Sequence, residues 1–180
     1  MHKLDIKNAT KSDAKLLAEI LTEATQYKLE RGDETWGSEP YSSQEAAELI
    51  ALGPTYLVYK DSKVVGTFAL LWDDEKNWGK QPPIAGYLCR MAVRRGAHGQ
   101  GLGQQIIAWA LKEVASKDRQ FLRLDCSAHN AELCTYYEKQ SFVQVATKQS
   151  PRNKDYLAAL YERPVDTATT RTNHGEHHHA

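Results

Sequence analysis

The sequence predicts an α/β fold in which a mixed central sheet of about seven strands carries helices on both faces. Two observations predict it. Segments with the two-residue alternation of strands take turns along the chain with segments of helical periodicity. In addition, the strand-like run from Tyr87 to Val93 passes through a glycine-rich loop directly into an amphipathic segment, which is a strand–loop–helix unit.

Runs of alternating, β-branched or aromatic residues mark the strands. The expected strands are residues 4–7, 56–59, 64–70, 87–93, 121–126, 142–145 and 156–161.

Four segments between these strands have the apolar spacing of helices. The first follows the start signal of Thr10 and Asp13, and the second follows Ser42 and Glu45, which fit a capping box. The third begins near Leu102, and the fourth begins at Asn130. We expect loops over residues 31–41 and 73–83, where periodicity is lost and glycine or proline collects.

A chain of 180 residues suits one domain with a sizeable core. We expect that domain to cover residues 1–164 and a disordered tail to cover residues 165–180, which are threonine-rich and end in a histidine run. The 23 basic and 23 acidic side chains balance, which argues against nucleic acid or an anionic membrane as partner.

The cysteines and the apolar segments indicate a cytoplasmic location. Cys89, Cys126 and Cys134 have neither metal-ligand spacing nor an obvious pairing, which indicates reduced thiols. No spaced set of histidine, cysteine and glutamate side chains predicts a metal site. The charged first residues do not resemble a signal peptide, and no segment has the about 20 apolar residues of a membrane span.

The glycine loop is the clearest functional signal. Gly99, Gly101 and Gly103 stand at alternate positions, so no Cβ atom covers the neighbouring backbone N–H groups. The start of the following helix adds unpaired N–H groups and the positive end of a dipole. Arg94 and Arg95 precede the loop and should attract an anion. Together these features predict a phosphate or pyrophosphate site.

Two common phosphate motifs do not fit. A P-loop needs Lys and Ser or Thr after its last glycine, but Gln104 and Gln105 follow Gly103. The dinucleotide fingerprint needs a third glycine where Gln104 or Ile106 stands, and it belongs in an opening βαβ unit.

The pattern His98-Gly99-Gln100-Gly101-Leu102-Gly103 before an amphipathic helix resembles another motif. This motif is the Gln/Arg-x-x-Gly-x-Gly/Ala loop of the GNAT superfamily, the acyl-CoA-dependent N-acyltransferases. A second stretch, Asn130 followed seven residues later by Tyr137-Glu138-Lys139-Gln140-Ser141-Phe142, is similar to the family's later motif, which ends Tyr-Glu-Lys-x-Gly-Phe. The resemblance is strong from about residue 87 to residue 145 and only general before that.

The resemblance implies a GNAT-like fold, acetyl-CoA as acyl donor, an amine as acceptor, and an N-acetyltransferase activity. It also makes a homodimer plausible. The residues that it assigns to the cofactor are Met91, Ala92, Val93, His98, Gly99, Gln100, Gly101, Leu102, Gly103, Gln104, Asn130 and Tyr137. Within this set, the residues from Gly99 to Gln104 would hold the pyrophosphate, and the backbone near Met91 and Val93 would pair with the pantetheine arm.

Tyr137 carries the chemical prediction. The family uses this position as a general acid that protonates the coenzyme A sulfur as it leaves. The alternative is a core aromatic residue, because Leu133, a tyrosine and Gln140 share one helical face. Tyr136 is the neighbour that could be confused with Tyr137, and Asn130 fits a helix N-cap with or without a cofactor contact.

Three residues depart from the family pattern. His98 stands where the family has Gln or Arg, and we expect a solvated loop histidine with weaker or more pH-dependent cofactor contact. Arg95 replaces a commonly seen proline. Ser141 replaces a glycine at a helix end where a left-handed residue is common, at a cost of up to roughly 1 kcal/mol.

The general base is left open among carboxylates. The candidates are Glu30, Asp33, Glu34, Asp73, Asp74, Glu75 and Asp125, most of which also fit solvated surface charges. Glu30, Glu34 and Trp36 lie in the segment where the family builds its acceptor pocket, and carboxylates beside aromatic rings suit a small cationic amine. Three alternatives to a small-amine acetyltransferase remain: an enzyme that acetylates a peptide or protein amine, a non-catalytic acyl-CoA-binding module, and a dinucleotide-binding domain.

Overall fold

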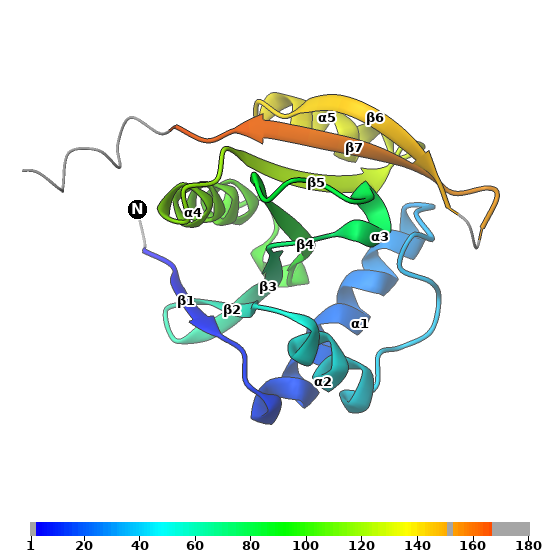
Figure 1. Cartoon of the computed structure of the whole chain (residues 1–180). Coiled ribbons are helices and arrows are strands. Elements are labelled where there is room, and N and C mark those ends of the chain that lie inside the picture. Colours follow the sequence, from blue (N-terminus) through cyan, green and yellow to red (C-terminus); the bar gives the residue numbers. More distant parts are fainter. Residues whose placement is uncertain (1–2, 151–152, 167–180) are drawn as a thin grey trace, which may run out of the picture.

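A computed structural model describes residues 3–150 and 153–166, and its helices and strands alternate as the periodicity predicts (Figure 1). The strands are β1 (Asp5–Asn8), β2 (Thr55–Lys60), β3 (Lys63–Leu71), β4 (Ala85–Val93), β5 (Phe121–Ser127), β6 (Val143–Gln149) and β7 (Leu157–Pro164). The helices are α1 (Ala14–Glu30), α2 (Ser43–Leu52), α3 (Glu75–Trp78), α4 (Leu102–Ser116) and α5 (Ala131–Lys139), with short 3-10 turns η1 (Lys11–Asp13) and η2 (Arg95–Ala97).

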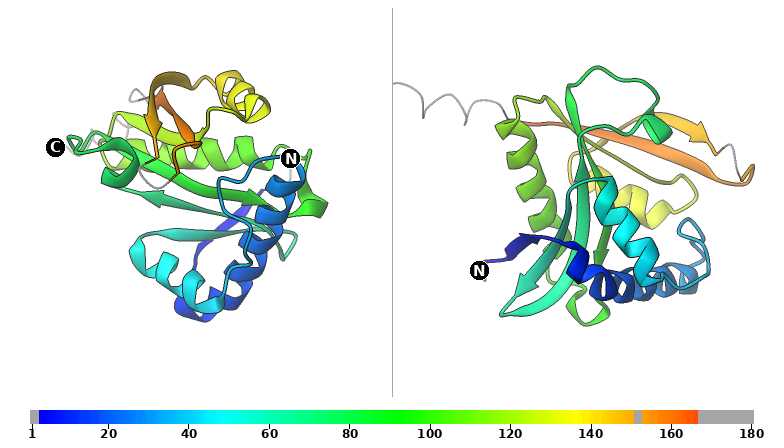
Figure 2. Two further views of the ribbon diagram at one scale, coloured as in Figure 1. Left: turned by 90° about the vertical axis from the view of Figure 1, so that its right-hand side faces the viewer. Right: turned by 60° about the horizontal axis from the view of Figure 1, so that its bottom comes forward.

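The described strands form one seven-stranded sheet in the order β1-β2-β3-β4-β5-β7-β6. Neighbouring strands are antiparallel except β4 and β5, which are parallel. Helices α1 and α2 cover one face, and α4 and α5 cover the other (Figures 1 and 2). The predicted mixed sheet with helices on both faces is therefore confirmed.

Three details differ from the sequence prediction. The expected loop over residues 73–83 contains the one-turn helix α3, which forms because the Asp74 carboxylate accepts a hydrogen bond from Asn77 N at 3.3 Å. Strand β6 runs four residues further than its apolar residues suggest, because β7 pairs with it as far as Gln149. Val165, expected in the tail, is buried, and its N–H donates to the Gln120 carbonyl oxygen at 2.8 Å. Residues 167–180, with the histidine run, lie outside the described part.

Strands β4 and β5 separate soon after they meet. They pair only from Ala85 to Tyr87 with residues 121–123, after which β5 continues along β7 and β4 continues along β3. A gap therefore opens in the sheet beyond these residues, and we call it the β4–β5 gap. It leaves one edge of each strand without a strand partner.

A bulge bends β4 where it leaves β5. Arg90 has a positive φ of 49°, and the register with β3 shifts there, since Cys89 lies opposite Ala69 and Ala92 lies opposite Thr67. One extra residue reverses the side-chain alternation. As a result Leu88 packs in the core under α4, whereas Ala92 packs against α1 on the opposite face.

The Asp33 carboxylate links the helices that cover the two faces of the sheet. Asp33, which follows α1, is 6% exposed. It accepts hydrogen bonds from Thr35 N at 3.0 Å, from the Thr35 hydroxyl and from Asn130 Nδ2 at 2.8 Å, and it pairs with Lys28 Nζ at 3.0 Å. Lys28 belongs to α1 and Asn130 directly precedes α5, so Asp33 links the helices of opposite faces.

These contacts keep Asp33 ionised. Burial alone would raise its pKa, but the hydrogen bonds from Thr35, Asn130 and Lys28 outweigh burial and lower the pKa to about 2. A carboxyl whose folded pKa is depressed stabilises the protein above its unfolded pKa, and this contribution is lost as the pH falls through the folded pKa.

We expect Asp33→Asn to lower the free energy of unfolding by about 2 kcal/mol at neutral pH, because an amide cannot pair with Lys28 or accept the same hydrogen bonds. The difference from the wild type should shrink between about pH 4 and pH 2, where the unfolded chain's Asp33 takes up a proton. Urea unfolding at pH 7 and pH 3 measures both effects. Glu34→Gln, at an exposed neighbouring position, is the control, and a loss at Asp33 that is equal at both pH values would contradict the linkage.

Candidate active site

The glycine loop lies between β4 and α4, as predicted. Gly99 and Gly101 have φ values of 75° and 73°, a left-handed conformation that glycine adopts without strain. Gly101 directly precedes the first residue of α4, so the loop delivers the chain to the helix through a left-handed turn. A Cβ atom at Gly103 would collide with the Tyr136 hydroxyl, which explains the third glycine of the pattern.

The backbone N–H groups from Gly99 to Gln104 donate no hydrogen bond to any other described residue. The first paired amide is that of Gln105, which donates to the Gly101 carbonyl oxygen at 3.2 Å. A row of unpaired donors at the positive end of a 15-residue helix is a site for an anion with several oxygens, such as a pyrophosphate. The fold supplies this site from main-chain atoms alone.

The two arginines before the loop do not add the expected net positive charge. Arg94 pairs with Glu23 at 3.3 Å, and Arg95 makes two hydrogen bonds to Glu30, at 3.0 and 2.7 Å. The Arg95 N–H also donates to Glu23 Oε1 at 2.7 Å. Both acids belong to α1, so these pairs hold the loop against that helix and neutralise the arginines.

The sequence suggests that His98 is a solvated loop histidine. In the structure His98 is exposed, but its ring also contacts a neighbouring aromatic residue. Its ring stacks on Tyr27 with centroids 4.4 Å apart, and the Arg31 guanidinium lies 3.5 Å from the centroid of the same Tyr27 ring. Burial against Tyr27 lowers the pKa of His98, and the charges of Arg31 and Arg95 lower it further. The imidazole is therefore neutral at neutral pH, and it anchors the loop to α1.

The expected acceptor residues are not brought together. Glu30 is engaged with Arg95, and the hydrogen bond to Arg95 lowers the pKa of Glu30. Glu34 is exposed, and Trp36 packs against α1 with Lys28 Nζ 5.2 Å from its ring centroid. Asp33, a candidate general base, already uses its carboxylate oxygens in hydrogen bonds and an ion pair with Thr35, Asn130 and Lys28. The cationic-amine prediction therefore loses its original support, because tertiary contacts use these side chains for packing and pairing.

Tyr137 lies in the core beneath α5 and is 7% exposed. Its ring contacts those of Phe142 and Tyr161, with centroids 5.8 and 6.2 Å apart, so it is a packing residue. Its hydroxyl makes no hydrogen bond to a described residue, and burial raises its pKa, so it stays protonated. A buried phenol with a free donor can also act as an acid, and the two interpretations are compatible.

The helix that carries Tyr137 begins and ends as predicted. Asn130 Oδ1 accepts a hydrogen bond from Leu133 N at 3.1 Å, which confirms an N-cap, while its amide nitrogen donates to Asp33. Ser141 adopts the left-handed conformation, with φ of 66°. Cys126 and Cys134 are unpaired thiols, but their sulfur atoms lie 3.8 Å apart, a proximity that their spacing in sequence did not suggest.

The other face of the β4–β5 gap holds polar groups that sequence reasoning mostly missed. Arg90 Nη2 and the Tyr156 hydroxyl are buried without a hydrogen-bond partner among the described residues. Asp125, one of the base candidates, is partly buried, and its charge is among the causes that raise the pKa of Tyr156, after burial. Burial and then the charge of Asp74 raise the pKa of Asp125 to about 6, and burial raises the pKa of the nearby Cys89 to about 12. No signal in the sequence places Arg90 or Tyr156 beside this gap.

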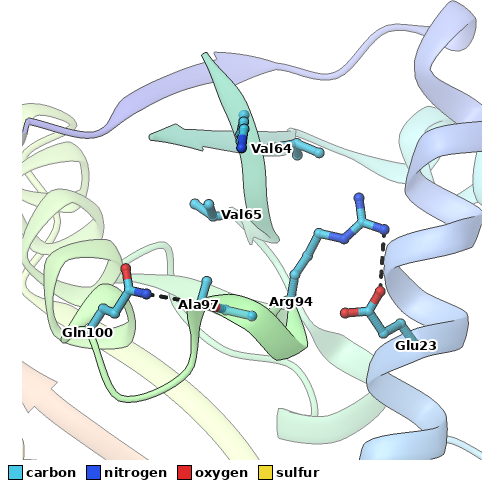
Figure 3. Close-up of a pocket in the computed structure, with 8 residues that line it drawn as sticks. Glu23, Val64, Val65, Arg94, Ala97 and Gln100 are labelled. Carbon is cyan, nitrogen blue, oxygen red and sulfur yellow. Dashed lines mark hydrogen bonds and ion pairs between the residues drawn. The ribbon is translucent and has the colours of Figure 1, made fainter. Parts of the chain in front are cut away.

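A hollow of about 620 Å³ lies beside Arg94, between α1, the start of β3 and the glycine loop (Figure 3). Its polar side chains are largely engaged, since Arg94 pairs with Glu23 and Gln100 bonds to the Gly96 carbonyl oxygen and to Lys60. None of the residues that line it belongs to the β4–β5 gap. The hollow and the β4–β5 gap are therefore separate features of the fold.

Two other kinds of site are absent from the described residues. No helix among them is long and apolar enough to cross a membrane. Within the same ranges, no three histidine, cysteine or acidic side chains gather as a metal site would require.

Comparisons with known proteins agree with this geometry. Residues 16–142 match the model of the acetyltransferase (GNAT) family. The uncharacterised N-acetyltransferase YesJ of Bacillus subtilis is 27% identical over 143 residues, which are 74% of this chain and 78% of YesJ. A GNAT-family acetyltransferase from Listeria monocytogenes has a similar crystal structure, with a TM-score of 0.72 and 22% identity over 89% of this chain and 94% of that chain. The structure of yncA from Salmonella typhimurium with its cofactor acetyl-CoA has a TM-score of 0.66 and 13% identity over 91% of this chain and 94% of that chain.

Proposed function

The chain belongs to the acetyltransferase (GNAT) family, and we propose that it transfers the acetyl group of acetyl-CoA directly to a small, cationic primary amine. The observation that carries the proposal is the row of unpaired amides from Gly99 to Gln104. Acetyl-CoA supplies a pyrophosphate for these donors and a thioester for the transfer. Its bound form in yncA, a protein of similar fold, supports this choice of donor.

The donor-binding assignment follows the main chain. The free edge of β4, at Met91, Ala92 and Val93, can pair with the amides of an extended pantetheine arm as an added strand would. The residues from His98 to Gln104 hold the pyrophosphate end, while Asn130 and Tyr137 flank the thioester end. The arm then runs along the β4–β5 gap, which is the region that the sheet leaves open.

Tyr137 is proposed as the general acid. When the amine nitrogen attacks the thioester carbonyl carbon, the carbon–sulfur bond breaks and its electron pair goes to sulfur. Tyr137 donates its proton to this sulfur, so that coenzyme A leaves as a thiol and not as a thiolate. No covalent enzyme intermediate is needed, because the amine itself is the nucleophile.

The cationic character of the acceptor now rests on different residues. Asp74 and Asp125 act on the gap from the α3 side, whereas Glu30 is paired elsewhere. Two carboxylates beside a partly buried site favour an ammonium group over an anion. A peptide amine remains the second choice of acceptor. The proposal also includes one domain over residues 1–164, a homodimeric assembly and a cytoplasmic location.

Gly101→Ala should weaken acetyl-CoA binding at least tenfold, because a Cβ atom covers the amides and disfavours the left-handed conformation. Gly37→Ala is the matched control: its φ of 80° is equally left-handed and its Cβ would also meet open space or ordinary contacts. Both variants should lose about 1 kcal/mol of stability. Calorimetric titration with acetyl-CoA distinguishes the two variants. Equal acetyl-CoA affinities of Gly101→Ala and Gly37→Ala would show that the loop is not part of the donor site.

Tyr137→Phe should lower kcat by about 10²- to 10⁴-fold, the usual contribution of a positioned acid, while acetyl-CoA affinity stays near that of the wild type. Tyr136→Phe removes the hydroxyl that lies beside Gly103 and serves as the comparison. Steady-state kinetics with calorimetry gives both quantities. A large loss in Tyr136→Phe together with normal turnover in Tyr137→Phe would transfer the role to Tyr136.

An acceptor panel tests the substrate class. We expect acetyl-CoA consumption with spermidine, glucosamine or lysine methyl ester, and little with aniline or 4-aminobenzoate, because an ammonium group complements Asp74 and Asp125. Turnover confined to neutral or anionic amines would overturn the cationic assignment. Binding of acetyl-CoA without turnover of any amine, short peptides included, would instead indicate a non-catalytic acyl-CoA-binding module.

A further inference from the structure

The β4–β5 gap connects the two faces of the sheet at one point on β5. Leu124 and Cys126 point into the core under α4 and α5, where they pack near Tyr137. Arg123 and Asp125, the two residues next to Leu124 in sequence, alternate to the other face, where Arg123 lies over the rings of Trp78 and Tyr87. Asp125 therefore faces α3 and α1, on the side of the sheet opposite Tyr137.

Asp125 and Tyr137 nevertheless act on each other. The charge of Asp125 is among the causes that raise the pKa of Tyr137, after burial and the neighbouring thiol of Cys126. It also raises the pKa values of Tyr156 and Cys89, so these groups lie within range of its charge. Asp125 and Tyr137 thus lie on opposite sides of the gap, with Tyr137 within range of the charge of Asp125.

Asp125 differs from the other acids around the site in having no partner among the described residues. Asp33 is filled by Lys28, Thr35 and Asn130, and Asp74 is used by the first turn of α3. Glu162 pairs with Arg123 at 2.7 Å. The Asp125 carboxylate, although partly buried, accepts no hydrogen bond from a described residue. Its oxygens are not among the fully buried polar atoms that lack a partner, so water or a ligand can reach them.

We propose that Asp125 is the general base of the transfer, taking a proton from the attacking amine on the side of the gap opposite Tyr137. This inference rests on the proposed acetyl transfer and names a catalytic residue for it. Asp125 accepts one proton from the neutral amine as the nitrogen lone pair forms the new bond to the carbonyl carbon, and Tyr137 gives its own proton to sulfur as the carbon–sulfur bond breaks. Solvent then takes the proton from Asp125 and returns one to Tyr137, so the amine and acetyl-CoA give the amide and free coenzyme A with no net change in protons.

The proposed acid, Tyr137, and the proposed base, Asp125, lie on opposite sides of the reacting group. A base on the acceptor side and an acid on the donor side cannot neutralise each other directly, because the sheet gap and the reacting group lie between them. Burial suits Asp125 to the role of a base, because with a pKa of about 6 it is ionised at neutral pH yet more basic than an exposed aspartate. The groups on its own side of the sheet are Asp74 before α3, Lys76 on α3, Cys89 on β4 and Tyr156 before β7, and its charge also acts on Cys126 of β5 and Tyr137 of α5 from the other side.

The test compares Asp125→Asn and Asp125→Glu with the wild type, using acetyl-CoA with spermidine, glucosamine and lysine methyl ester. Asp125→Asn should lose at least about 100-fold in kcat, and the limb of the wild-type pH profile near pH 6 should disappear. Acetyl-CoA affinity measured by calorimetry should stay unchanged. Asp125→Glu should recover part of the activity, because it restores a carboxylate, whereas a purely structural role would not favour it over the isosteric amide.

Stability provides a second readout. The folded pKa of Asp125 is raised, so its ionisation opposes folding above that pKa and not below the unfolded value. Asp125→Asn should therefore melt at a higher temperature than the wild type at pH 7.5, with a smaller difference at pH 4. Asp118→Asn is the control, since Asp118 is an exposed residue with φ of 55°, a conformation that asparagine tolerates.

The outcomes separate this inference from the proposed function. If the wild type acetylates an amine and Asp125→Asn does so within threefold with the same pH profile, Asp125 is not the base and the acetyl transfer stands. If the wild type binds acetyl-CoA but acetylates no amine in the panel, both proposals fall. A destabilised Asp125→Asn at pH 7.5 would also contradict the inference, because it would give the carboxylate a structural role.

Discussion

The separation of β4 from β5 is the constraint on which the rest of the site depends. A parallel pair that remained bonded along its whole length would leave no room for an acyl donor between the strands. The bulge at Arg90 bends β4 at the point where the pairing with β5 ends, while β5 continues along β7. In the proposed transfer the reacting group lies in this gap, with the Tyr137 phenol on one side and the Asp125 carboxylate on the other.

Much of the fold could be predicted from the sequence, because its signals are local. The capping box of Ser42 and Glu45 is confirmed, with hydrogen bonds of 2.7 and 3.1 Å. The apolar face of α4 and the left-handed Ser141 are likewise determined by neighbouring residues. Helix α3 was missed because one turn has no periodicity to detect, and the length of β6 was missed because its partner strand decides it.

The site was predictable to the extent that the main chain builds it. Alternate glycines before an amphipathic helix indicate free amides, whatever surrounds them, and the family assignment drawn from the two motifs is confirmed. Side-chain roles were less predictable. Glu23 and Glu30 are more than sixty positions from Arg94 and Arg95, so nothing in their spacing reveals that they pair. Asp125 looked like any other strand carboxylate, and only the fold separates it from Asp33 and Asp74.

The ion pairs between α1 and the glycine loop have a consequence for selectivity. With Arg94 and Arg95 neutralised by Glu23 and Glu30, the loop generates little long-range attraction, so it does not collect passing anions by steering. What remains is a fixed set of backbone N–H dipoles, which act at short range and bind a ligand well only if its oxygens fit them. Small inorganic ions therefore gain little from long-range attraction at the proposed site. Discrimination there depends on the fit of the ligand's oxygens, in a protein that carries no net charge.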